Sequence, residues 1–171
     1  MESSYEKSFE KDLENYELNE KLEKARNVVL GFTASTSVTG AIPIPFADAP
    51  LLITQQVAMM VAINSVFKME VDKNTLKALA AGAIGVGGVT VAGKTIASNL
   101  IKLIPGPGSI VGGAVSAGTA GVLTLALGNA YIEVCRAVQN GTLRVEDLGG
   151  KKGMLMLKDS FKAELKKNRK K

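Results

Sequence analysis

The sequence predicts an all-α protein, a helical bundle, on three observations. Apolar residues recur at the three- and four-residue spacing of amphipathic helices along most of the chain. Capping residues and Pro or Gly breakers divide the chain into segments of helical length. Small residues recur every three or four positions in two long segments, which lets helices approach closely. We expect those two segments to form an antiparallel, Gly/Ala-rich helix hairpin over about 73–102 and 109–139.

Charge divides the chain into three regions. Residues 1–26 carry 8 acidic and 5 basic side chains, whereas residues 151–171 carry 2 acidic and 9 basic ones. The 124 residues between them carry only 13 charges, where a soluble segment of ordinary composition has roughly 31. This middle part is expected to be buried in its own core, in a partner or in a membrane. We therefore expect an acidic N-terminal helix (1–26), a Gly-rich helical domain (27–140), and a loop with a basic C-terminal helix and tail (141–171).

The first helix is expected over residues 3–30, where charges of opposite sign alternate at helical spacing. A thin apolar stripe follows the same spacing and consists of Phe9, Leu13, Tyr16, Leu22 and Ala25. The segment that begins at Gly31 is expected to break this helix.

Two prolines and an aspartate then predict an extended segment followed by a helix. Pro43 and Pro45 hold the chain extended. Asp48 is a helix cap, and Pro50 suits the first turn of a helix over about 49–68. Asp72 can cap the next helix.

Small-residue ridges mark both arms of the expected hairpin. The first arm carries Ala81, Gly85, Gly88 and Ala92 on one face. The turn contains Pro105, Gly106 and Gly108. The second arm carries one ridge of Gly112, Ser116, Ala120, Thr124 and Gly128, and a second of Gly113, Ala117 and Gly121. Asn140-Gly141 is expected to end this arm, followed by a loop over 142–153 and a basic helix over 154–168.

The composition argues against an enzyme. The chain has no His and one Cys, which excludes a disulfide framework, the common Cys/His zinc sites and a His-activated nucleophile. Cys135 lies beside Arg136 without a His partner, which favours a small packed side chain. We expect no catalytic residue, no cofactor and no metal site.

One stretch matches a nucleotide-binding pattern, but its context does not. Gly88–Thr95 reads G-x-x-x-x-G-K-T, the pattern of a phosphate-binding loop. A strand should precede such a loop, whereas the preceding residues read as a small-residue helix. No charged residue lies between Lys102 and Glu133, so a metal-binding Asp is missing there. Nucleotide binding is the least favoured of the functions considered.

The composition of the middle of the chain suits either the core of a soluble domain or a membrane-inserted segment. Leu103–Ile132 is 30 residues without a charge, longer than the ~20 that cross a bilayer, but half of its best window is Gly, Ala, Ser and Thr. The partner run, 78–93, is 16 residues and short for a span. The acidic start of the chain is unlike a signal peptide, so we expect a cytoplasmic location, at or in the inner membrane.

The basic end of the chain is a candidate membrane-surface contact. It consists of Lys166, Lys167, Arg169, Lys170 and Lys171 behind an amphipathic helix. Lysines there attract anionic lipid at about 1 kcal/mol each. A solubilising tail is the alternative. Specific nucleic-acid binding is not expected, because few aromatics accompany the charges.

Four stretches read together resemble a known family. They are Ala41–Asp48, Gln55 or Gln56 with Met59-Met60, Asn99–Gly113, and Thr124–Tyr131. In this order they look like the YcjF-type domain of unknown function found C-terminal to Era-like GTPases, over about residues 22–140. The resemblance implies an all-helical, non-catalytic module tied to a GTPase and often to membranes. In this chain an acidic helix replaces the GTPase domain that usually precedes the YcjF-type domain, so any GTPase would be a separate chain.

The sequence therefore predicts a non-catalytic, membrane-associated accessory protein that works with a separate GTPase or by self-association as a homo-oligomer. A membrane-inserting, pore-forming hairpin is the alternative. The expected structural and interaction residues are Pro43, Pro45, Asp48, Gln56, Gly85, Gly88, Pro105, Gly106, Gly108, Gly112, Gly113, Gly128 and Tyr131.

Overall fold

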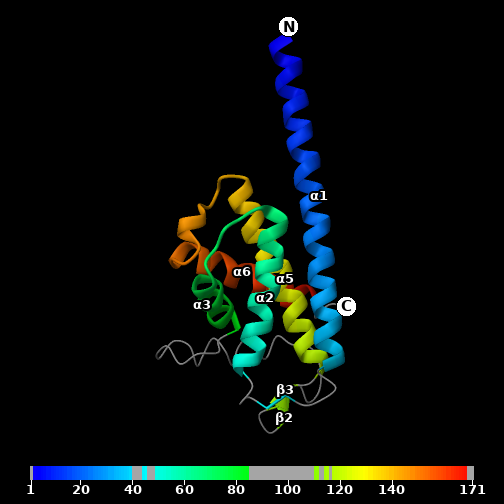
Figure 1. Ribbon diagram of the computed structural model, residues 1–171, viewed down its shortest axis with the longest axis vertical. Helices are drawn as coiled ribbons and strands as arrows, with labels where there is room; N and C mark the ends of the chain where they lie inside the picture. Colours follow the sequence, from blue (N-terminus) through cyan, green and yellow to red (C-terminus); the bar gives the residue numbers. More distant parts are fainter. Residues whose placement is uncertain are drawn as a thin grey trace.

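The structure is a computed structural model that describes the backbone of residues 2–39, 44–45, 49–84, 110–111, 114–115 and 117–168 (Figure 1). Side chains are described within these ranges for residues 5–35, 53–84 and 120–167. The helices of this part are α1 (Glu2–Thr39), α2 (Ala49–Phe67), α3 (Lys73–Ile84), α5 (Ala117–Gln139) and α6 (Lys151–Asn168), with a 3₁₀ turn at Val145–Asp147. The predicted all-α helical bundle is confirmed.

Helix α5 is the centre of the bundle, and α1, α2 and α6 pack around it (Figure 1). Helix α3 lies against α2 and α6. The N-terminal part of α1 projects beyond the other helices as a free rod (Figure 1). The first buried α1 residue is Leu22, so the core of the bundle begins about halfway along this helix.

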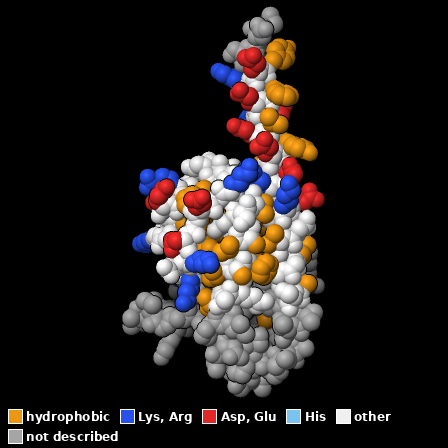
Figure 2. Space-filling model, viewed as in Figure 1, with side chains coloured by type: hydrophobic (Ala, Val, Ile, Leu, Met, Phe, Trp, Pro, Cys, Tyr) orange, Lys and Arg blue, Asp and Glu red, His pale blue; other side chains and the backbone are white. Residues whose placement is uncertain are grey.

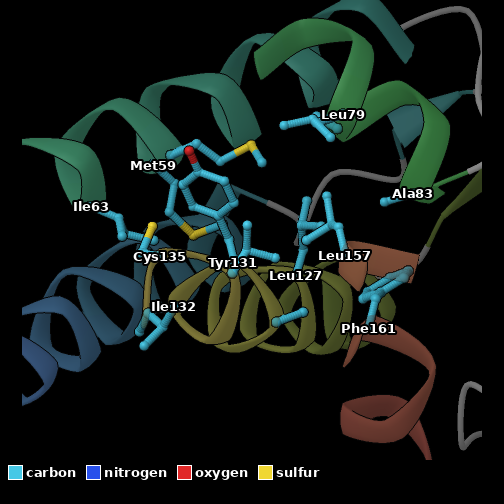
Figure 3. Packing of buried hydrophobic residues seen from close by; sticks show 14 of the residues in the cluster. Met59, Ile63, Leu79, Ala83, Leu127, Tyr131, Ile132, Cys135, Leu157 and Phe161 are labelled. Atoms are coloured by element: carbon cyan, nitrogen blue, oxygen red, sulfur yellow. The ribbon is translucent and has the colours of Figure 1, made fainter. Parts of the chain in front are cut away.

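The core is formed by apolar side chains from every helix (Figure 3). Tyr131 and Leu127 of α5 are fully buried between Met59 of α2 and the α6 residues Leu157 and Phe161. Because α5 contributes to all of these contacts, its small residues set how closely the other helices can approach.

Several predicted helix boundaries are confirmed by the structure. The helix predicted over 49–68 is α2. Helix α3 begins at Lys73, and Asp72 caps it, since the Thr75 amide donates to Asp72 Oδ1 at 2.9 Å. Helix α5 ends before Gly141, which adopts a φ of 71°.

The predicted break at Gly31 is wrong, because α1 continues to Thr39. The hydroxyls beyond Gly31 bond to carbonyls of the preceding turn: Thr33 Oγ1 donates to Val29 O at 2.8 Å, and Ser35 Oγ to Phe32 O at 2.9 Å. Since these side chains bond within the helix, they extend α1 without competing for another conformation.

The second hairpin arm starts later than predicted, because Ile110–Val111 and Ala114–Val115 are short strands, β2 and β3, and α5 begins at Ala117. The β-branched residues favour extended backbone here. Ile44–Pro45 is strand β1, as the prolines predicted, and Pro45 is paired with Ala114. Strand β3 also pairs antiparallel with β2, which makes a three-stranded patch.

The loop predicted over 142–153 is also shorter than expected, because α6 already begins at Lys151. Gly153, inside the first turn of α6, is buried against the Leu148 backbone, where a Cβ would lie 2.4 Å from Leu148 O. A glycine at this position lets the helix start directly beneath the preceding turn.

The described parts of the predicted hairpin, α3 and α5, take their main partners elsewhere: α3 on α2 and α6, and α5 on α1 and α6. The remainder of the hairpin lies outside the described residues. The α5 ridge at Gly128 accordingly meets α1 and α2. A Cβ there would lie 2.6 Å from the Val29 methyls and 3.1 Å from Met59 Sδ.

Candidate interaction surfaces

Two predicted residues, Gln56 and Tyr131, belong to a buried polar seam between α2 and α5. Gln56 Nε2 donates to Thr124 Oγ1 at 2.9 Å, and the Tyr131 hydroxyl donates to Asn64 Oδ1 at 2.8 Å. The Cys135 thiol lies 3.9 Å from the same Asn64 oxygen. Gln56, Asn64, Thr124 and Tyr131 are each less than 5% exposed. The seam therefore fixes the register of two helices and does not open to a ligand.

The titratable groups of the seam, Tyr131 and Cys135, are protonated at neutral pH. Burial raises the pKa of the Tyr131 hydroxyl and of the Cys135 thiol above their ordinary values. Both groups thus keep their protons at neutral pH, so Cys135 is not a thiolate nucleophile. The described residues also contain no group of three His, Cys, Asp or Glu side chains that could hold a metal ion.

One end of the bundle exposes a basic helix face. Lys151, Lys162 and Lys166 of α6 are exposed and fall on one side of the helix, and Leu155 between them is 49% exposed. We call these four residues the α6 basic face. One acidic residue, Asp159, is also exposed on this side of α6. A different side of α6 buries Leu157, Phe161 and Leu165 in the core. The packing therefore holds the α6 basic face outward.

The projecting part of α1 exposes a second surface, an aromatic stripe. Tyr5, Phe9, Leu13 and Tyr16 are spaced by four, four and three residues and are 74%, 70%, 49% and 68% exposed. We call them the α1 aromatic stripe. Figure 2 shows hydrophobic side chains along one side of this rod and acidic side chains along the other. Large exposed apolar groups aligned in this way are typical of interaction surfaces.

A shallow groove of about 360 Å³ lies where α1, α5 and α6 meet. Its charged lining residues are Arg26, Glu133, Glu164 and Lys167. Lys167 Nζ pairs with Glu164 at 2.6 Å. With two cations and two anions, the groove has no net charge that would select an ionic ligand.

By length and composition, one helix in the described part, Ala120–Gln139 within α5, is apolar enough to cross a membrane. However, 67% of its apolar window is buried inside the bundle. The core helix of a soluble protein satisfies the same test, so this finding alone is weak evidence for a membrane span.

The structure places some predicted site residues and leaves others undescribed. Gln56, Gly128 and Tyr131 come together along α5 and α2, and Lys166 and Lys167 end α6. The predicted residues outside the described part are Pro43, Asp48, Gly85, Gly88, Pro105, Gly106, Gly108, Gly112, Gly113, Arg169, Lys170 and Lys171. Most of the Gly88–Thr95 pattern and of the uncharged run is outside it as well.

The predicted apolar stripe of Phe9, Leu13, Tyr16, Leu22 and Ala25 is wrong as a single surface, because the first three are exposed on the projecting part of α1, whereas Leu22 and Ala25 are buried on the other side of the helix. Sequence reasoning therefore missed the α1 aromatic stripe as an exposed surface. The exposure of its residues depends on where the bundle ends along α1, and the sequence carries no local signal for that. Gly153 was also missed, because its close approach to Leu148 is a tertiary contact.

These features define an all-helical bundle with exposed helix faces and, in its described part, no catalytic constellation. The chain belongs to the family described as a domain of unknown function (DUF697), whose profile matches residues 5–169. Comparison with curated proteins and with solved structures finds no match.

Proposed function

We propose that the chain is a non-catalytic accessory protein that associates with the cytoplasmic face of an anionic membrane and works with a separate GTPase or by self-association. The observation that carries the membrane part is the α6 basic face. Three exposed lysines and one exposed acidic residue, Asp159, surround a half-exposed leucine, which leaves the face with a net positive charge, and α6 is anchored in the core by its buried residues.

The energetics of such a face suit a reversible surface contact. Each lysine near an anionic bilayer contributes about 1 kcal/mol, and the attraction falls off within a Debye length. Leu155 can insert among the headgroups while the charges remain in water. Lys166 belongs both to this face and to the predicted basic tail, so the two extend one basic surface.

The GTPase part rests on the resemblance to domains that follow Era-like GTPases. It predicts a separate GTPase chain as partner. Affinity purification of the full-length chain from its native host, with and without bound GTP analogue, tests this part. Recovery of no GTPase in either condition would contradict it.

Vesicle flotation tests the membrane proposal. We expect the full chain to float with vesicles that contain anionic phosphatidylglycerol and not to bind neutral phosphatidylcholine vesicles. Salt at ~1 M, where the Debye length is about 3 Å, should release the bound protein. Lys162→Gln with Lys166→Gln should weaken binding about tenfold or more, since two charges are removed. The matched control is Lys73→Gln with Lys77→Gln, two exposed lysines on α3, which should bind as the wild type does.

Two outcomes of flotation would contradict the proposal. One is equal binding to neutral and anionic vesicles, and the other is no binding to either. Salt-resistant binding with release of trapped dye would instead favour the alternative, a membrane-inserting hairpin. The burial of α5 inside the bundle argues against that alternative. Nucleotide binding through Gly88–Thr95 remains the weakest candidate, and calorimetry with ATP and GTP decides it.

A further inference from the structure

The α1 aromatic stripe has no packing partner among the described residues of its own bundle. The stripe residues point to one side of α1, and the residues that pack α1 on the bundle, Leu22, Ala25 and Val29, fall on the opposite side at about 100° per residue. The stripe is therefore not a continuation of the intramolecular contact. A short helix that stands free in water is also only marginally stable. A second molecule that covers the stripe would stabilise it.

The charges beside the stripe specify what kind of surface covers it. Residues 5–17 contain five acidic residues and two lysines. Glu6, Glu10 and Glu17 form a row along one flank of the stripe at helical spacing. Two stripes packed antiparallel on each other would bring these rows of like charge together. The complementary surface is therefore a basic one.

The chain itself carries such a surface in the α6 basic face. Its three lysines outnumber the one exposed acidic residue on the same side, Asp159, and surround Leu155, so the face has a net positive charge around an apolar centre and complements an apolar stripe flanked by glutamates. At 1.5 Å per residue, the 18 residues of α6 span about 27 Å, which exceeds the roughly 17 Å from Tyr5 to Tyr16, so the whole stripe can lie along α6.

The contact has to form between two molecules. Helix α1 is unbroken from Glu2 to Thr39, and its N-terminal part points away from the bundle (Figure 1). The stripe cannot fold back onto α6 of the same chain without breaking that helix.

We propose that the projecting part of α1 docks on α6 of a second copy of this chain, with the α1 aromatic stripe over Leu155 and the glutamate row against Lys162 and Lys166. This inference rests on the self-association branch of the proposed function. It adds that self-association and membrane binding use the same α6 basic face and therefore compete.

Sedimentation velocity of the full chain tests this contact. The wild type is expected to be associated at low salt and monomeric at ~1 M salt. Phe9→Ser with Tyr16→Ser should shift the dissociation constant at least tenfold. The matched control is Leu30→Ser, which also removes a large exposed α1 side chain, but one outside the stripe, and should leave association unchanged.

A charge exchange makes the test specific for α6. Lys162→Glu with Lys166→Glu should abolish association, and Glu10→Lys with Glu17→Lys in the same chain should restore it. All substituted side chains are exposed, so the fold is expected to persist, and circular dichroism checks this. A wild type that is monomeric at low salt overturns the proposal. Association that survives the stripe or lysine variants overturns it too.

Vesicles separate this proposal from the membrane proposal. If the contact is correct, anionic vesicles dissociate the oligomer, while the Phe9→Ser, Tyr16→Ser variant still floats with them. A monomeric wild type that floats contradicts only the helix contact. An associated wild type that never floats contradicts only the membrane part.

Discussion

Gly128 is a residue at which α5 packs closely on α1. A Cβ at this position would lie 2.6 Å from both Val29 methyls, and Val29 is fully buried and cannot move aside. Overpacking of this kind costs about 1–3 kcal/mol, more than the helix propensity gained by replacing Gly. We expect Gly128→Ala to lower the free energy of unfolding by about 1–2 kcal/mol in urea titrations.

Gly31→Ala is the matched control for that substitution. Gly31 also lies inside a helix, but nothing is within 4 Å of a Cβ there. The same change should therefore raise the free energy of unfolding by about 0.5–1 kcal/mol. Equal effects at the two glycines would contradict this account, because they would show that the close packing of α5 on α1 does not require a glycine at position 128.

The Tyr131 and Cys135 protons make stability fall at alkaline pH. Burial raises both pKa values in the folded chain, so the unfolded chain releases these protons first. The contribution is fully present below about pH 8.5 and is lost progressively as the pH rises above it. We expect the urea midpoint to decrease from about pH 8.5 upwards, and Tyr131→Phe with Cys135→Ala to flatten that decrease. An unchanged slope in the double variant would refute this account.

At the scale of elements, helix α3 depends on its cap. The Thr75 amide and hydroxyl both donate to the Asp72 carboxylate, and the hydroxyl bond is the main cause of the lowered Asp72 pKa. We expect Asp72→Ala to cost about 1 kcal/mol of unfolding free energy, and Asp72→Asn less, because Asn also caps helices. Glu70→Ala, at an exposed position just before the cap, should change stability by less than about 0.5 kcal/mol.

The C-terminal half of α1 packs in the core, whereas its N-terminal half exposes the α1 aromatic stripe. Phe9 and Tyr16 are exposed, so replacing both by Ser should alter the free energy of unfolding by less than about 0.5 kcal/mol each at dilute protein. Val29→Ala removes a buried side chain and should cost about 2 kcal/mol. Comparable losses for the two changes would mean that the aromatic stripe is part of the core after all.

The elements also show what sequence could and could not provide. Helix α2, the Asp72 cap and the end of α5 were predicted because each depends on local signals, a capping side chain or a glycine at a C-terminus. The continuation of α1 past Gly31 was not predicted, because a glycine followed by hydroxyl residues suits a turn as well as a helix. The strands before α5 were not predicted either, because they depend on the pairing of β1 with β3, which lie far apart in the sequence. Gln56 and Tyr131 were singled out, but their partners lie 68 and 67 residues away, and single-sequence spacing gives no pairing over that distance.

For the whole molecule, the buried part and the exposed faces have separate roles. The seam between α2 and α5 and the close approach at Gly128 hold a bundle whose central helix is covered on several sides. The α6 basic face and the α1 aromatic stripe take no part in that packing. This division suits the proposed function, in which the bundle contacts a membrane surface through the α6 basic face and is not inserted in the bilayer.

Membrane fractionation of the full-length protein tests that claim most directly. Membranes from expressing cells are washed first in high salt and then in alkaline carbonate. We predict release by salt, because a surface contact made by lysines is screened at high ionic strength. Retention through carbonate would contradict the account, since it would mean that the uncharged segment of the chain is inserted in the bilayer.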